Sequence, residues 1–366
     1  TTAGAVGAGA VTGLTNSRRQ YVNFANDAGK WLLCFKGADS HRKYSGSAWS
    51  VNSITGSSGS ITLDPTQLID ATLNKRRIFM VEKATLRVWY LAADAISGAS
   101  SLLDLGPIFA KGGELVGIST WSVDGGQGMD DLLVCITNQG QLAVYGGTDP
   151  SDPANWALVG VFDIGKPLGR RALVKYGADL VCITADGVVP LSRLIPFARG
   201  QEQLVSLTSK IQDAFAQAAG SWSGNFGWEA ILYPAGQLVL VNVPAQQLVL
   251  SYQYVQNVQT GAWALFDGWN ANCFAIANDL LYFGGLTTVA KADTGGSDNG
   301  TAITCDVTPA FNRHGTSGIK QYTLIRPLIR APLTVAPAID MLTDYATAAP
   351  GSIPTPSSAT AGYGVW

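Results

Sequence analysis

Histidine is nearly absent from the sequence: His41 and His314 are the only two among 366 residues. Each lies in a polar, basic turn, and neither belongs to a nucleophile–histidine motif such as G-x-S-x-G or to a zinc motif such as HExxH. The chain also has no P-loop and no GxGxxG motif that opens a helix. We therefore expect two exposed loop histidines, no catalytic residues, no cofactor and no enzyme activity.

Charge is sparse as well. Charged residues make up 14% of the chain, against roughly 25% in an average soluble domain. The formal net charge of −2 gives no overall attraction to nucleic acid. Hydrophobic residues reach 47%, yet no run of 18 apolar residues occurs, so no membrane insertion is expected. We expect partner subunits to cover much of the surface; the alternative is a glycine-rich β monomer with polar loops.

The five cysteines form no CxxC pair, and the first four lie in or beside apolar tracts that read as strands: Cys34, Cys135, Cys182, Cys273 and, last, Cys305. This placement predicts small buried hydrophobic residues in a reducing compartment, with no disulfide and no zinc site. Residues 1–13 are rich in Ala and Gly and lack both a charged n-region and a long apolar core. We expect no secretory signal there.

What the chain does contain is an internal repeat. The tract Leu133–Thr137 reads Leu-Val-Cys-Ile-Thr and is followed, two residues later, by Gly140. The same five residues return 47 positions on, at Leu180–Thr184, again followed after two residues by Gly187. Gly140-Gln141-Leu142-Ala143-Val144 also has a near copy at Gly236–Leu240. A fixed period of this kind is typical of architectures in which similar units stack on one another.

Turn centres placed at residues 37, 84, 140, 187, 236 and 285 are 47, 56, 47, 49 and 49 residues apart. Each unit reads as an apolar strand, a short turn and a second strand, and some units add a tryptophan strand, as at Trp49, Trp156 and Trp263. Propeller blades have a period of roughly 40 to 50 residues. The sequence therefore predicts an all-β chain folded as a β-propeller of about six blades. Five or seven blades, and a sandwich with evenly spaced hairpins, are the alternatives.

Three segments depart from the strand pattern. Residues 1–20 read as an N-terminal arm, followed by the propeller at 21–295. Apolar residues recur at helical spacing over 204–219, which predicts one inserted helix before Gly220. Residues 296–366 read as a partial, possibly incomplete C-terminal β module, because a Gly- and Ser-rich tract precedes the alternating tract Ile319–Arg330.

The candidate binding residues are basic. Lys75, Arg76, Arg77, Arg170 and Arg171 are candidates for contact with nucleic acid or an adjacent subunit; the alternative interpretation is solvated loop charge. The acidic, glycine-containing loop Asp124–Asp131 is a candidate calcium loop, but it lacks the alternating ligands and terminal Glu of an EF-hand, so a structural turn is the favoured interpretation. Ser122–Gly126 half-matches the Asp-box turn of sialidase propellers.

Several tracts resemble hallmark sequences of tail proteins from short-tailed bacteriophages (podoviruses). These tracts are Phe79–Leu91, Thr120–Asp131, Tyr145–Pro150, Trp156–Phe162, Ile164–Arg171, and Lys320–Thr323 with Arg326-Pro327. Together they fall within residues 20–330. The group they resemble is the tail nozzle, also called the packaged-DNA stabilisation or tail hub protein.

The resemblance implies a propeller that assembles as a homohexameric ring below the portal and adaptor and extends the DNA channel. It implies a structural virion protein that retains the packaged genome and permits its ejection. The expected partners are the tail adaptor, the tail fibre, spike or needle proteins, and double-stranded DNA in the channel. The expected location is the virion tail, after synthesis in the host cytoplasm. No catalytic residues are shared in that family. The alternative function is a carbohydrate-binding or glycoside-cleaving propeller that recognises a host receptor.

Overall fold

A computed structural model of the chain describes residues 2–5, 11–16, 18–124, 129–194, 206–295, 297–298, 301–302, 310–315 and 318. It divides into two units, Thr1–Ala302 and Ile303–Trp366. Most of the second unit, including the predicted strand Ile319–Arg330, lies outside the described residues. In the described part of the chain, no helix is long and apolar enough to cross a membrane.

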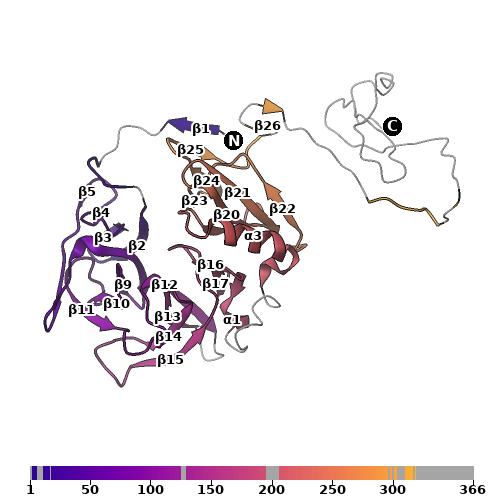
Figure 1. Cartoon of the computed structure of the whole chain (residues 1–366). Coiled ribbons are helices and arrows are strands. Elements are labelled where there is room, and N and C mark those ends of the chain that lie inside the picture. The colour runs from indigo at the N-terminus through magenta and orange to yellow at the C-terminus, as the bar shows by residue number, and fades with distance from the viewer. Residues whose placement is uncertain are drawn as a thin grey trace. The chain divides into compact units, whose positions relative to one another are not determined.

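The first unit is a six-bladed β-propeller (Figure 1). The strands of each blade are given from the axis outward. Blade 1 contains β2 (Gln20–Asn26), β3 (Gly29–Phe35), β4 (Arg42–Tyr44) and β5 (Trp49–Val51), and blade 2 contains β8 (Leu68–Asn74), β9 (Arg77–Glu82), β10 (Arg87–Leu91) and β11 (Gly98–Asp104). Blade 3 contains β12 (Leu115–Asp124), β13 (Met129–Thr137), β14 (Gln141–Gly147) and β15 (Trp156–Asp163). Blades 4 and 5 contain β16 (Leu173–Tyr176), β17 (Asp179–Thr184) and β18 (Gly187–Pro190); and β19 (Glu229–Tyr233), β20 (Leu238–Gln246), β21 (Leu250–Asn257) and β22 (Trp263–Phe266).

Blade 6 contains β23 (Cys273–Ala277), β24 (Leu280–Gly284) and β25 (Thr288–Lys291), with β1 (Thr2–Ala5) as its outer strand. Thr2 pairs with Lys291 and Ala5 with Thr288 in an antiparallel ladder. The N-terminus therefore completes the last blade, and backbone hydrogen bonds join the two ends of the ring. Residues 1–20 were predicted to form an arm, whereas four of them are a strand of the propeller.

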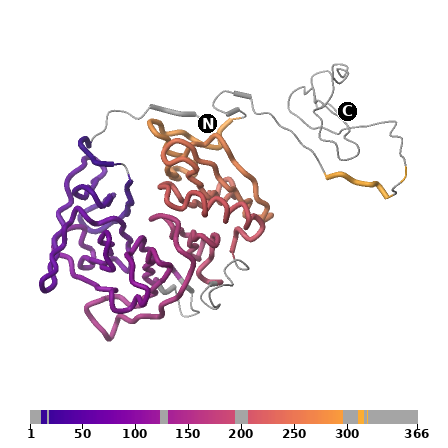
Figure 2. The backbone as a smooth tube through the Cα atoms, in the orientation of Figure 1, coloured from indigo at the N-terminus to yellow at the C-terminus, as the bar shows by residue number. Residues whose placement is uncertain are grey.

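The first strands of consecutive blades lie side by side, from β2 through β8, β12, β16 and β19 to β23. The chain therefore passes once around the ring, as its path in Figure 2 shows. Two short strands, β6 (Ile54–Ser58) and β7 (Ile61–Thr62), extend blade 2, where β6 pairs in parallel with β11. The remaining short elements are η1 (Pro65–Gln67), α1 (Leu191–Leu194), and the hairpin of β26 (Ser297–Asp298) and β27 (Thr301–Ala302).

The repeated pentapeptide forms the second strand of blade 3 and of blade 4, and all ten of its residues are buried. Leu133 and Cys135 pack into the apolar cluster between blades 2 and 3, whereas Val134 and Ile136 pack into the cluster between blades 3 and 4. Successive side chains of a strand point to opposite faces of its sheet. A blade buried on both faces therefore requires an uninterrupted apolar strand, which is what the sequence repeats.

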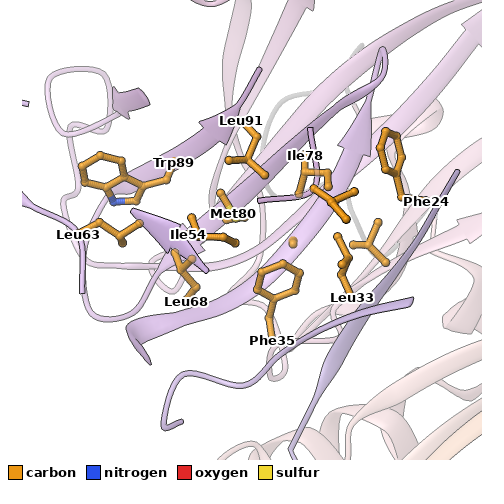
Figure 3. Packing of buried hydrophobic residues seen from close by; sticks show 13 residues of the cluster. Phe24, Leu33, Phe35, Ile54, Leu63, Leu68, Ile78, Met80, Trp89 and Leu91 are labelled. Carbon is orange, nitrogen blue, oxygen red and sulfur yellow. The ribbon is translucent and has the colours of Figure 1, made fainter. Parts of the chain in front are cut away.

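Five apolar clusters join successive blades in this way, from blades 1 and 2 to blades 5 and 6. Figure 3 shows the first, in which Phe24, Leu33 and Phe35 of blade 1 lie with Ile78 and Met80 of blade 2. Each fully buried side chain of this size contributes about 1.5–3 kcal/mol to folding. Cys34, Cys135 and Cys182 are buried, as predicted, and are free thiols. Cys273 is only half-buried, and Cys305 lies outside the described residues.

Most of the predicted turn centres separate the second and third strands of a blade, but the one at residue 236 separates the first and second strands of blade 5. The resemblance of Gly236–Leu240 to Gly140–Val144 is therefore not a structural equivalence: the first tract leads into β20 and the second into β14. The equivalent turn of blade 5 is Gln247-Leu248-Val249, which contains no glycine and places Leu248 at a φ of 67°. Because this turn contains no glycine, the spacing of glycines in the sequence does not indicate it.

Blade 4 has three strands, and a helical segment follows it. The segment was predicted at 204–219 and consists of η2 (Leu207–Ile211) and α3 (Gln212–Trp222); residues 201–205 lie outside the described residues. The Thr208 hydroxyl accepts a hydrogen bond from the Val188 amide of β18 at 3.2 Å, and the Ser206 hydroxyl donates to the Val188 carbonyl at 3.1 Å. These hydroxyl groups occupy backbone positions of the blade edge that a fourth strand would otherwise pair.

Gly140 is a position where the turn requires glycine. Its φ is +76°, and a Cβ there would lie 2.4 Å from the Ile164 carbonyl oxygen. Gly177 has a similar φ of +61° but no atom within 4 Å of that point. We expect Gly140→Ala to lower the free energy of unfolding by at least about 1 kcal/mol more than Gly177→Ala, because only the first adds a steric clash. Denaturant unfolding of both variants tests this, and equal losses would contradict it.

Candidate binding site at the propeller axis

The five predicted basic residues lie in two separate places. Lys75 and Arg76 form the turn between β8 and β9, with φ of 44° and 64°. Arg76 pairs with Asp94, and Arg77, the first residue of β9, pairs with Asp149 at 2.5 Å. This turn follows the end of the first strand of blade 2. Arg170 and Arg171 instead precede the start of β16, the first strand of blade 4. Contact of these residues with nucleic acid or a neighbouring subunit stays a prediction.

Arg170 and Arg171 belong to a cluster built where the first strands of the blades begin. We call this set the axial cluster: Arg18 and Arg19 before β2, Asp70 in β8, Arg170 and Arg171 before β16, and Phe226 and Glu229 before and at the start of β19. The first strands of the blades converge around the propeller axis. Residues that are far apart in the sequence therefore meet at one end of that axis.

Arg171 connects four blades. Its Nη1 donates to Glu229 Oε2 of blade 5 at 2.9 Å and to the Asn272 carbonyl, which precedes blade 6, at 3.4 Å. Its Nε donates to Gln20 Oε1 of blade 1 at 3.1 Å, and its Nη2 donates to the Arg19 carbonyl at 3.2 Å. Arg171 itself precedes blade 4 and forms an isolated parallel bridge with Glu229. One planar guanidinium group thus holds the starts of four blades together.

Two acidic side chains of the cluster are held by the backbone. Burial raises the pKa of Asp70 to about 7, against the opposing effect of hydrogen bonds from the Ile118 and Ala71 amides and of the nearby Arg170 and Arg171 charges. Burial also raises the pKa of Glu229, although the Arg171 charge and the Phe274 amide act in the opposite direction. Burial of the two carboxyl groups therefore acts against the stabilising effect of the arginines beside them.

Arg18 and Arg170 have a different environment. The guanidinium group of Arg18 lies over the ring of Phe226, 4.5 Å from its centroid, and that of Arg171 lies 5.5 Å from the same centroid. Arg170 Nη1 donates to the Lys36 carbonyl at 3.4 Å. Among the described residues, neither Arg18 nor Arg170 has a carboxylate oxygen within 4 Å. Burial lowers the pKa of Arg170; the negative charges of Asp70 and Glu114 act in the opposite direction, and the positive charge of Arg18 adds to the lowering.

The cluster has more positive than negative charge at neutral pH. It contains four guanidinium groups, and the carboxyl groups that act on it are Asp70, Glu229 and, beside Arg170, Glu114. The neighbouring Lys36 ammonium is already paired with Asp39. Four guanidinium groups therefore face three carboxyl groups. Such a site suits an anion.

Of the axial cluster, the sequence predicted only Arg170 and Arg171 as candidate binding residues. The Arg18-Arg19 pair is visible in the sequence, but nothing there indicates that it meets Arg170 and Arg171. Asp70 and Glu229 could have been found as single acids inside apolar strand tracts, Leu68-Ile69-Asp70-Ala71 and Trp228-Glu229-Ala230-Ile231. A charged residue at a buried strand position requires a compensating partner.

His41 is buried rather than exposed, so the expectation for this residue was wrong. The centroid of its ring lies 4.8 Å from that of Phe35, although the polar residues around it in the sequence favour a solvated turn. His314 is exposed, as expected. The described residues contain no group of three or more His, Cys, Asp or Glu side chains placed to hold a metal ion. Residues 125–128 of the predicted Asp124–Asp131 loop lie outside the described residues.

Comparison with known proteins shows no family for this chain. No protein-family model and no curated protein matches the chain. Similar solved structures include YCF48 bound to D1 peptide, at 13% identity over 79% of this chain and 84% of that one, with a TM-score of 0.40. Another is the SapL1 lectin in complex with alpha methyl fucoside, at 12% identity over 72% and 87%, with a TM-score of 0.36. Similarity at this level carries no argument about function.

Loss of Arg171 should destabilise the propeller more than loss of an exposed arginine. We expect Arg171→Met to lower the free energy of unfolding by about 3 kcal/mol, because it leaves the half-buried Glu229 carboxylate without its partner. Adding Glu229→Gln to this variant should recover part of the loss. Arg76→Met, which removes an exposed ion pair, is the matched control and should leave the unfolding midpoint nearly unchanged. Equal effects of the two single substitutions would refute this role for Arg171.

Burial of His41 should make the fold sensitive to acid. Burial lowers the pKa of His41 from 6.5 to about 4, against smaller opposing effects of the Pro65 backbone and Asp64. The folded state thus favours the neutral ring, so this contribution is complete above pH 6.5 and is lost as the pH falls toward 4. It is worth at most about 3 kcal/mol. We expect His41→Phe to show a weaker loss of stability between pH 7 and pH 4 than the parent chain. His314→Phe should retain the parent slope.

Proposed function

We propose that this chain is a structural subunit of a homohexameric tail nozzle in a short-tailed bacteriophage. In this role it extends the DNA channel, retains the packaged genome and permits its ejection. Its partners are the tail adaptor, the fibre, spike or needle proteins, and the DNA in the channel. Its location is the virion tail, and its activity is assembly rather than catalysis.

The resemblance to tail nozzle sequences supports the proposal, because most of its tracts lie in strands of blades 2 and 3 and in the segment that joins blade 3 to blade 4. Phe79–Leu91 supplies most of β9 and all of β10 in blade 2, and Thr120–Asp131 runs from β12 into β13 of blade 3. Ile164–Arg171 connects β15 to β16 and ends at Arg171, which contacts four blades. A tract that determines how blades join fits a protein whose role is rigidity.

One observation supports a ring more directly than any other. Large apolar side chains are exposed on the outermost strands of several blades: Leu158 (41% exposed) and Val159 (59%) on β15 of blade 3, and Leu265 (60%) on β22 of blade 5. A cyclic ring of identical subunits requires two different adhesive surfaces on each subunit. Two outer strands on different blades could supply such a pair. Exposed apolar surface of this kind is typical of sites of association.

The test is the oligomeric state of the purified chain. We expect light scattering and electron microscopy to show a hexameric ring. We expect Leu158→Asp combined with Val159→Asp to shift the population to monomers, because a charge on the outer strand must lose its solvation on contact. Val249→Asp, on the exposed turn between β20 and β21, is the matched control and should leave the ring intact.

Two results would count against the proposal. One is a parent chain that stays monomeric at all concentrations and also when mixed with the adaptor ring of a short-tailed phage. The other is reproducible binding of one class of host surface glycan by a monomeric chain, which would favour receptor recognition. Glycan-array binding with the same preparations gives that second readout.

A further inference from the structure

Arg18 and Arg170 are two arginines of one cluster that lack a carboxylate partner among the described residues. Arg77, Arg87 and Arg171 each pair with a carboxylate, whereas half-buried Arg19 and Arg42 have none among the described residues. Hydrogen bonds connect Arg18 to Arg170 through Asn16 and Lys36: the Arg18 amide donates to Asn16 Oδ1 at 3.0 Å, Lys36 Nζ donates to the Asn16 carbonyl at 3.1 Å, and Arg170 Nη1 donates to the Lys36 carbonyl at 3.4 Å. The positive charge of Arg18 also lowers the pKa of Arg170. Two like charges held near each other raise the free energy of the folded state unless an anion offsets them.

The nearby carboxyl groups are already engaged. Asp70 accepts the Ala71 amide through Oδ1 at 2.9 Å and the Ile118 amide through Oδ2 at 3.1 Å. Glu229 Oε2 accepts both Arg171 and the Phe274 amide. Their acceptors point to the backbone and to Arg171, so they do not form ion pairs with Arg18 or Arg170. Against the effect of burial, the charges of Asp70 and Glu114 act to raise the pKa of Arg170, but among the described residues no carboxylate oxygen lies within 4 Å of either Arg18 or Arg170.

The guanidinium group of Arg18 is held in place, and among the described residues its N–H groups donate no hydrogen bond. Its backbone amide donates to Asn16 Oδ1 at 3.0 Å, which fixes the segment before β2, and its guanidinium group rests on the Phe226 ring. A guanidinium group has five N–H donors, and stacking on a ring face uses none of them. Arg18, Arg170 and Phe226 are all half-buried rather than sealed, so a ligand can reach them from solvent.

We propose that Arg18 and Arg170 form an oxyanion-binding site at the axial end of the propeller, and that its ligand carries a phosphate group. A phosphate group presents several oxygens and up to two negative charges, which matches two guanidinium forks better than a single carboxylate does. The Phe226 ring orients Arg18. The guanidinium group of Arg171 also lies over this ring and is itself held by its hydrogen bond to Glu229. The site does not depend on the tail nozzle function, because it is complete within one chain.

The experiment is calorimetric titration of the full chain with inorganic phosphate, with sodium chloride at equal ionic strength as the reference. We expect saturable binding of phosphate alone. We expect Arg18→Gln and Arg170→Gln each to weaken it at least tenfold, and Arg18→Lys, which keeps the charge but loses the planar fork, to weaken it less. Arg87→Gln, whose side chain pairs with Glu82 in blade 2, is the matched control and should bind as the parent does.

Circular dichroism and the thermal midpoint of each variant establish that it is folded, and Arg18→Lys serves as the reporter if a Gln variant is not. Absence of saturable phosphate binding by the parent chain would overturn the proposal. An equal loss of affinity in Arg87→Gln would overturn it too, since that would indicate diffuse attraction by surface charge.

A competition experiment distinguishes two sources of the phosphate group. If a short DNA duplex displaces phosphate, and Arg18→Gln weakens both, the ligand is a nucleic acid phosphodiester. If phosphate binds with the same dependence on Arg18 and Arg170 but DNA does not displace it, the ligand is a free phosphate or a small phosphate ester. Ring assembly is measured separately, so failure of this site and failure of the proposed function are distinguishable.

Discussion

Burial of both faces of the sheet in blades 2 to 5 is the constraint on which the rest of the structure depends. In each of these blades, alternate residues of the second strand pack into two different apolar clusters, one with each neighbouring blade. Leu180 and Cys182 share a cluster with blade 3, whereas Val181 and Ile183 share one with blade 5. No blade can therefore be stable alone, and the fold requires its ring of neighbours.

The junction between blades 6 and 1 is made by other means. Apolar clusters are described for the five junctions from blade 1 to blade 6. At the sixth, the described contacts include the β1–β25 ladder at the outside and the hydrogen bonds of Arg171 to Gln20, Arg19 and Asn272 at the axis. Closure of the ring thus combines backbone pairing at its periphery with a charged side chain at its centre.

The axial cluster follows from that closure. Innermost strands that begin at one end of the axis bring their preceding residues together, whatever their separation in the sequence. Arg171 contacts Arg19 across 152 positions and Glu229 across 58. The low dielectric of the interior then acts on the carboxyl groups: burial raises the pKa of both Asp70 and Glu229 despite the adjacent arginines. Arg18, Arg19 and Arg170 have no such carboxylate at ion-pair distance among the described residues, so the cluster has an excess of positive charge.

The sequence by itself determined the blades, because a strand buried on both faces must be apolar throughout and the Leu-Val-Cys-Ile-Thr tract states this twice. It also located the outer tryptophan strands at Trp49, Trp156 and Trp263 and the inserted helix. The sequence misplaced the turn of blade 5 because Gln247–Val249 lacks glycine. It also misjudged His41, because a residue flanked by polar neighbours in the sequence can still be buried in the fold. Only the tertiary structure decided that Thr2–Ala5 completes blade 6 and that Arg18 and Arg170 belong to one cluster. Strand pairing at that range and convergence on an axis depend on the closed ring, which no local pattern of residues encodes.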